Sequence, residues 1–185
     1  IHNWQKHGKK FIKVSVNMSR TTLRKKNVVQ KAVAICSKYQ IEPQMIEIEI
    51  TESIGGLEKK LITRLMDDFH AAGFSIALDD FGSGFSNIAA LAENDFDVVK
   101  FDKSLIDTIF ENDKSRTVIQ QAINLCNAVN KNIETVGEGV ETEQQLQILK
   151  EYGCDIGQGY LFSRPIPEEK FLKYFLTGEN GEKCD

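Results

Sequence analysis

Short apolar runs alternate with longer segments of helical periodicity along the chain. The short runs are typical of strands, and they are Phe11–Asn17, Gln44–Thr51, Phe74–Asp80, Phe96–Asp102, Asn132–Glu138 and Cys154–Gly159. Between and after them, the periodicity predicts helices over residues 28–39, 57–73, 86–94, 115–130, 142–153 and 166–176. Gly73 and Gly153 are well placed to end two of these helices, because glycine tolerates the left-handed backbone conformation.

Strands that alternate with helices of this length predict a parallel α/β fold. Two architectures satisfy the pattern: an open doubly wound sheet and a TIM-like (β/α)8 barrel. No glycine-rich phosphate loop follows any of the strands, which disfavours the usual nucleotide-binding open sheets. A barrel needs two strands beyond the six found here, and the chain opens without Met in the helix-like segment IHNWQKHGKKF. We therefore expect a barrel domain over residues 1–176 whose first part lies upstream, and a polar tail over residues 177–185.

Composition and charge exclude several classes of protein. The formal net charge is −4, so the chain lacks the basic surface with which proteins bind DNA or RNA. The four cysteines are scattered without a metal-binding pattern, which indicates reduced thiols in the cytoplasm. No apolar run approaches the roughly 18 residues of a membrane-spanning helix, and no signal peptide opens the chain. We expect a cytoplasmic domain, and a membrane-tethered parent protein stays open as an alternative.

Polar and charged side chains recur at the C-terminal ends of the predicted strands, where a barrel builds its active site. They are Asn17, Glu49, Glu52, Asp79, Asp80, Lys100, Asp102, Glu138, Glu141 and Gln158. Taken singly, an Asp at a strand end is more often a helix cap or turn residue than a ligand. Likewise, Glu47 and Glu49 fit a half-exposed strand, and Lys100 fits a surface position. Recurrence on strand after strand favours a site, because a strand buried on both faces carries charge only where that charge has a partner.

The oxygen atoms of these Asn, Asp and Glu side chains are hard ligands that suit Mg²⁺ or Mn²⁺. Asp79 and Asp80 are adjacent, so they can bridge or flank two such ions. Two metal ions about 4 Å apart can activate a water molecule and stabilise the leaving oxygen of a phosphate ester. Lys100 would then orient the water and neutralise charge that develops on the phosphoryl oxygens. These residues therefore predict a two-metal phosphoesterase.

Six segments occur in an order that is known from one family: VNMS, EIEITES, DDFGSGFS, VVKFDKSLI, GEGVETEQQ and GCDIGQGYLFSRP. With them the chain resembles EAL domains, bacterial phosphodiesterases that linearise the second messenger cyclic di-GMP, from about Trp4 to Phe175. The resemblance implies a barrel of the EAL type, cyclic di-GMP as the substrate and a two-metal site for Mg²⁺ or Mn²⁺. It also implies a homodimer and, in the parent chain, fusion to sensory or GGDEF domains.

The resemblance further implies a role for each candidate residue. The metal ligands would be Asn17, Glu49, Asp79, Asp80 and Glu138, and the catalytic side chains would be Lys100, Asp80 and Glu138. The substrate would be contacted by Asp102, Glu141 and Gln158. A mobile gate, pinned by Glu52, would couple dimerisation to metal binding, and its residues are Phe81, Gly82, Ser83, Gly84, Phe85 and Ser86.

One motif of the family is absent. No stretch of the 185 residues supplies the Glu-x-Leu-x-Arg segment, whose glutamate is a metal ligand and whose arginine helps to hold the substrate in this family. We therefore expect these residues to be inactive until an upstream segment supplies that motif. Smaller departures are Ser83, Phe85 and Gly137, where the family often has Thr, Tyr and Ala. Two further interpretations stay open: a degenerate EAL domain that binds cyclic di-GMP or a partner protein, and a different two-metal phosphoesterase on a barrel.

Overall fold

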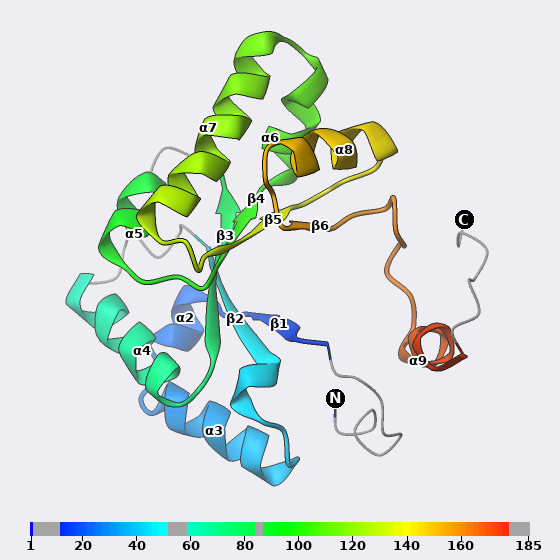
Figure 1. Ribbon diagram of the computed structural model, residues 1–185. Helices are drawn as coiled ribbons and strands as arrows, with labels where there is room; N and C mark the ends of the chain where they lie inside the picture. The colour runs from blue at the N-terminus through cyan, green and yellow to red at the C-terminus, as the bar shows by residue number, and fades with distance from the viewer. Residues whose placement is uncertain (2–11, 52–58, 84–86, 178–185) are drawn as a thin grey trace.

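The computed structural model describes residue 1 and residues 12–51, 59–83 and 87–177. Within these residues one sheet contains six strands in chain order: β1 (Val14–Asn17), β2 (Ile46–Thr51), β3 (Ser75–Phe81), β4 (Val98–Phe101), β5 (Glu134–Gly137) and β6 (Ile156–Gly157). Every neighbouring pair is parallel. The sheet forms a half-barrel with β1 and β6 at its two edges (Figure 1). The predicted parallel α/β fold with six strands is therefore confirmed.

Helices connect successive strands and cover the outer face of the sheet, whereas the last helix follows β6 and lies away from the sheet (Figure 1). They are α2 (Arg20–Leu23), α3 (Val28–Lys38), α4 (Lys59–Ala71), α5 (Asn87–Glu93), α6 (Lys103–Asp107), α7 (Asp113–Val129), α8 (Glu143–Glu151) and α9 (Glu168–Thr177). Gly73 and Gly153 have φ angles of 90° and 82°, so each supplies the left-handed residue expected after a helix. None of the helices in the described part of the chain is long and apolar enough to cross a bilayer.

Alternation along the strands separates the two faces of the sheet. In β2, Ile48 and Ile50 belong to the large apolar cluster that the helices cover, whereas Glu47 and Glu49 take the opposite, concave face. A separate small apolar cluster consists of Ala77, Val98 and Val136. The outer face therefore supplies the main core, which leaves the concave face of the half-barrel free to carry charged side chains.

Several local features differ from the predicted elements. Helices α2 and α6 have four and five residues, too few to show a helical period, and the sequence pattern missed both. The last predicted strand shrinks to Ile156–Gly157 because only these residues pair with β5. Helix α7 begins at Asp113, two residues before the predicted start, since the side chain of Asn112 accepts a hydrogen bond from the Ser115 amide. Thr177 ends α9, and the rest of the predicted tail lies outside the described residues.

Candidate active site

The strand register gathers acidic residues at the end of the sheet where the C-terminal ends of the strands lie. This end is called the C-terminal edge below. Asn17 in β1 pairs with Glu49 in β2, and Thr51 in β2 pairs with Asp79 in β3. Because the strands are parallel, their C-terminal ends and the residues that follow them lie at the same edge. Glu49, Asp79 and Lys100 have exposed fractions of only 5%, 8% and 5%. Three ionisable groups are therefore removed from water at this edge.

Burial of these charges rules out two simpler interpretations. Glu47 and Glu49 are both buried, so the interpretation that they face solvent on a half-exposed strand is wrong. Lys100 is buried as well, so its interpretation as a surface lysine is also wrong. Glu47 lies on β2 two residues before the candidate ligand Glu49, and its Oε1 accepts a hydrogen bond of 2.8 Å from Ser15 Oγ. The curvature of the half-barrel explains the error, because it encloses the concave face on which alternation places these residues.

Lys100 lies at the centre of the buried charges. Its Nζ is 2.5 Å from Glu49 Oε1, 2.6 Å from Glu138 Oε1 and 3.5 Å from Asp79 Oδ1. Burial lowers the pKa of the ammonium, but hydrogen bonds to Glu138 and Glu49 and the charges of Glu138 and Asp79 outweigh it, and the pKa is raised. Lys100 therefore stays protonated at neutral pH and offsets part of the negative charge at this edge.

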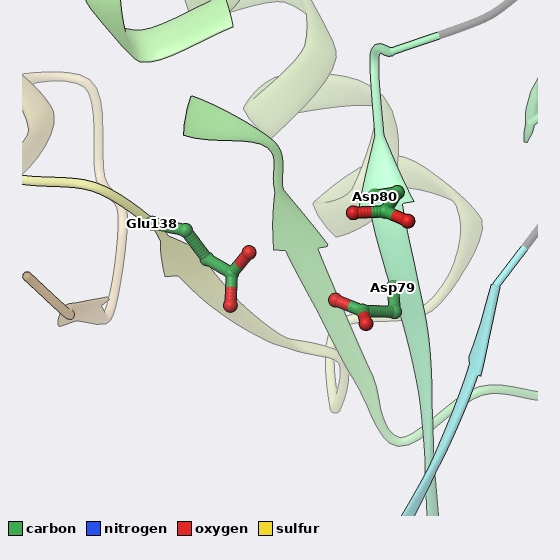
Figure 2. Close-up of side chains that lie close together, drawn as sticks. All are labelled: Asp79, Asp80 and Glu138. Carbon is green, nitrogen blue, oxygen red and sulfur yellow. The ribbon is translucent and has the colours of Figure 1, made fainter. Parts of the chain in front are cut away.

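Asp79, Asp80 and Glu138 converge from β3 and from the end of β5 (Figure 2). One oxygen atom from each carboxylate lies within 4.8 Å of the other two. Asp79 Oδ1 is buried and accepts no hydrogen bond from the described residues, although Lys100 Nζ lies 3.5 Å away. A buried carboxylate oxygen without a hydrogen-bond donor is costly. A bound cation would satisfy this oxygen, so the three carboxylates fit a cation site.

The backbone at Asp80 brings two consecutive carboxylates into this cluster. Successive side chains of a regular strand point to opposite faces, so Asp79 and Asp80 would normally diverge. Asp80 instead has a φ angle of 58°, in the left-handed region, and the pairing of β3 with β4 shifts register between Leu78 and Phe81. Such irregularities redirect side chains, and Asp is one of the few residues besides glycine that enters this region readily. The site therefore depends on local backbone strain as well as on strand pairing.

Glu138 follows β5 directly and is the most solvent-accessible acid around Lys100. Burial raises the pKa of its carboxyl group, while the hydrogen bond and charge of Lys100 oppose that rise. A carboxylate with a raised pKa accepts a proton more readily than an ordinary glutamate. Glu138 can therefore both contact a cation and receive a proton.

The three residues predicted to contact substrate occupy the same edge but have different local roles. The carboxylate of Asp102 caps α6 and accepts a hydrogen bond of 2.9 Å from the Ser104 amide. Glu141 Oε1 accepts a hydrogen bond of 2.9 Å from Lys103 Nζ. The backbone amide of Gln158 donates a hydrogen bond to Gly137 O, and Gln158 is exposed to solvent. Substrate contact by these three residues stays a prediction.

The structure describes the first half of the predicted gate. Phe81 is buried and packs edge-on against Phe101, with ring centroids 5.5 Å apart. Gly82 follows with a φ of 97°, and Ser83 donates hydrogen bonds from its amide and hydroxyl to Asp80 O. These contacts form a tight turn immediately after the carboxylate pair. The remaining residues predicted for the gate and its pin, Gly84, Phe85, Ser86 and Glu52, lie outside the described residues.

Two residues near the site were missed by the sequence analysis. Gln145 Oε1 accepts hydrogen bonds from the amides of Glu141 and Thr142, at 2.9 Å and 3.0 Å. The spacing of Thr142 and Gln145, three residues apart before an apolar run, is the signature of a capping box and would have indicated this contact. Lys103 carried no signal, because its partner Glu141 is 38 residues away in the chain.

Comparison with known proteins identifies relatives over most of the chain. The model of the family described as EAL domain matches residues 1–165. Cyclic di-GMP phosphodiesterase RocR from Pseudomonas aeruginosa is 32% identical over 169 residues, which are 88% of this chain and 41% of the relative. The chain spans between about a fifth and two fifths of the length of the curated relatives that it matches.

Solved structures show the same fold. The EAL domain of DcpA from Mycobacterium smegmatis superposes with a TM-score of 0.88 at 27% identity, covering 96% of this chain and 79% of that domain chain. Klebsiella pneumoniae BlrP1, in a complex with manganese and cyclic di-GMP, gives a TM-score of 0.78 at 25% identity, covering 88% of this chain and 41% of that protein. The half-barrel is therefore that of a TIM-like EAL domain.

Proposed function

The chain belongs to the EAL domain family, and from this premise we propose that its acidic site hydrolyses cyclic di-GMP to the linear dinucleotide with the help of divalent cations. The observation that carries the proposal is the buried, unsatisfied Oδ1 of Asp79 beside Asp80 and Glu138, next to the permanently charged Lys100. Support also comes from the relative named as a cyclic di-GMP phosphodiesterase and from the complex of BlrP1 with cyclic di-GMP.

Asp79, Asp80 and Glu138 would hold the cation, and Glu49 and Asn17, which pair across β2 and β1, are proposed as further oxygen donors. We favour Mg²⁺ or Mn²⁺, because all of these donors are hard oxygen ligands. When bound, divalent cations polarise a phosphoryl oxygen and lower the pKa of coordinated water. Without such cations, the carboxylates would repel the phosphates of the substrate.

The protein's own residues have distinct tasks in the proposed reaction. Lys100 points its ammonium group into the cluster, where it can orient the attacking water and neutralise charge on the phosphoryl oxygens. Glu138, whose carboxylate is the most accessible of the acids around Lys100, can accept the proton that the water releases. Attack on phosphorus breaks one phosphorus–oxygen bond, and the leaving 3′-oxygen takes up a proton to give the linear product. Asp102, Glu141 and Gln158 are proposed to contact the substrate around this centre.

The direct test is conversion of cyclic di-GMP by the full-length protein, measured by chromatography with Mg²⁺, with Mn²⁺ and after removal of metal by a chelator. We expect hydrolysis that requires one of the two cations. Binding without hydrolysis under all conditions would instead support the alternative of a degenerate EAL domain that acts as a cyclic di-GMP receptor. Failure to bind or hydrolyse cyclic di-GMP would overturn the proposal.

We further propose a homodimer formed through the segment after Asp80, including α5, in a cytoplasmic protein that also carries sensory or GGDEF domains. Ile88 supports the dimer: it lies in α5, one turn from the predicted gate, and 62% of its surface is exposed. An apolar side chain of this size gains free energy if a second copy covers it. The same segment joins the dimer surface to Asp80, which would let assembly influence the site.

A further inference from the structure

We propose that Lys103 is a positioning residue for the reaction: it holds Glu141 and thereby fixes the loop of residues 138–142, here called the β5–α8 loop, which carries Glu138. The inference rests on the proposed function for its catalytic consequence. The contacts themselves belong to the structure and can be tested without any reaction.

Two lysines and two glutamates with the same spacing connect the ends of β4 and β5. Lys100 Nζ lies 2.6 Å from Glu138 Oε1, and three residues further along both segments Lys103 Nζ lies 2.9 Å from Glu141 Oε1. In the first pair Lys100 is buried and Glu138 is mostly covered, whereas the side chains of the second pair are about half exposed. The second pair therefore repeats the first at a more exposed position, further from Asp79 along both segments.

The stem of Lys103 also contacts the backbone immediately after Glu138. Gly139 has a φ angle of 68°, and a Cβ atom at this position would lie only 2.4 Å from Lys103 Cγ and 2.6 Å from Lys103 Cβ. The side chain of Lys103 can lie across the loop only because residue 139 is glycine. Lys103 thus contacts the β5–α8 loop twice, through its methylene groups at Gly139 and through its ammonium group at Glu141.

Further contacts restrain the ammonium group of Lys103 and the backbone at both ends of the β5–α8 loop. Lys103 Nζ is 2.9 Å from Asp107 Oδ1, one turn later on α6, which limits the positions that the ammonium group can take. The Glu138 amide donates to Phe101 O, and the Glu141 amide donates to Gln145 Oε1. The loop backbone is therefore anchored at both ends, and Lys103 is the side chain that anchors the carboxylate of Glu141 from α6.

The expected effect is modest, because pairs between exposed charges contribute little to stability. Lys103→Met keeps most of the stem on Gly139 and removes only the charge, so we expect kcat to fall about two- to fivefold with KM nearly unchanged. Lys103→Arg should restore kcat, since it keeps the charge and a similar reach. In the exchange rates of the loop amides, Glu141→Gln should resemble Lys103→Met, and combining the two substitutions should add nothing further to those rates, because both remove the same interaction.

Hydrogen exchange of the full-length protein gives a readout that does not depend on activity. In Lys103→Met, the amides of residues 140–142 should exchange several times faster, whereas Lys131→Met should behave as wild type in both assays. Lys131 is an exposed lysine in the connection before β5, at the opposite end of the sheet, and is therefore a matched control.

Three outcomes would overturn the inference. They are unchanged exchange in Lys103→Met, unchanged kcat, or a higher KM at constant kcat, which would make Lys103 a substrate contact instead. Absence of hydrolysis in the wild-type protein would contradict the proposed function, and the exchange rates alone would then decide whether Lys103 holds the loop.

Discussion

At the scale of single residues, the site depends on one unusual backbone conformation. Asp79 and Asp80 are adjacent in the sequence, which was sufficient to predict a shared role for their carboxylates. The φ of 58° at Asp80 and the register shift beside it are what place both carboxylates near Glu138. Neither feature has a signal in the local sequence, because Asp is compatible with an ordinary strand end as well as with the left-handed region.

Asp80→Asn separates the charge of this residue from its backbone conformation. Asn enters the left-handed region as readily as Asp, so the thermal unfolding midpoint should change little. The proposed cation site loses one negative charge, so we expect the transition state to lose several kcal/mol of stabilisation. The rate of cyclic di-GMP hydrolysis should then fall about a thousandfold. The matched control is Asp95→Asn, an exposed carboxylate before β4 at the other end of the sheet. Near wild-type turnover of Asp80→Asn would contradict the two-metal interpretation.

The buried cysteines give a prediction for pH dependence. Burial raises the pKa of the Cys126 thiol to about 12 and also raises the pKa values of Cys154 and Cys36. In the unfolded chain a thiol loses its proton near pH 8.5, whereas the folded protein keeps the proton on Cys126 until about pH 12. The unfolded state therefore binds fewer protons in this range, so the free energy of unfolding falls as pH rises.

Equilibrium unfolding in urea between pH 7.5 and 10 tests this sign. The contribution of Cys126 should be fully present below about pH 8 and decline by at most about 1.4 kcal/mol per pH unit above it. Cys126→Ala should have a lower free energy of unfolding at neutral pH because it leaves a small cavity, but a shallower decline with pH. An equal decline in both proteins would show that Cys126 does not titrate differently in the two states.

At the scale of elements, two aspartates that each precede a strand accept hydrogen bonds from a residue near the start of the neighbouring strand that comes before it in the chain. Asp97 precedes β4 and accepts a hydrogen bond of 2.7 Å from the Ile76 amide, and the same oxygen is 2.9 Å from His70 Nε2. Asp155 precedes β6 and accepts hydrogen bonds of 2.8 Å and 2.7 Å from the amide and hydroxyl of Thr135. Both contacts lie at the end of the sheet opposite the candidate site, where barrel residues serve stability.

Asp155→Ala should destabilise the fold without altering the site. Thr135 is fully buried, so its amide would lose its acceptor in a place that water reaches poorly. We expect a loss of about 1–3 kcal/mol in the free energy of unfolding, measured with urea. Asp95→Ala, which changes an exposed carboxylate at the same end of the sheet, should cost less than about 0.5 kcal/mol. Reduced kcat in folded Asp155→Ala would show that the two ends of the sheet are coupled.

The elements that could be predicted are those long enough to show a period. The apolar runs of β2 and β3 and the helical spacing of α7 locate these elements within about two residues of their bounds. Asp102 shows the limit of this approach: it closes a predicted strand, but the structure uses it to cap α6, a helix of five residues. A polar residue after a strand predicts its position at the C-terminal edge, and it leaves open whether its side chain points to the site or to a helix end.

At the scale of the whole molecule, the sequence predicts which residues lie on the concave face more readily than it predicts which of them contact one another. Parallel topology alone places Glu49, Asp79, Lys100 and Glu138 at one edge, and the alternation of strands and helices was sufficient to predict that topology. The link between Lys103 and Glu141 joins residues 38 positions apart and depends on the spacing of β4 and β5 in the finished sheet. Contacts of this kind follow from the fold and have no local pattern.

The proposed dimer gives the last prediction, which concerns the assembled molecule. If α5 is covered by a second copy, Ile88→Asp should place a charge in an apolar interface, and the dissociation constant of the dimer should rise at least tenfold. Light scattering after size-exclusion chromatography of the full-length protein measures the change. Val118→Asp is the matched control, because Val118 is 56% exposed on α7 and lies outside the proposed contact. If Val118→Asp dissociates the dimer and Ile88→Asp does not, the dimer forms through α7, and assembly then acts on a helix that follows β4 and leaves the turn after Asp80 free of the interface.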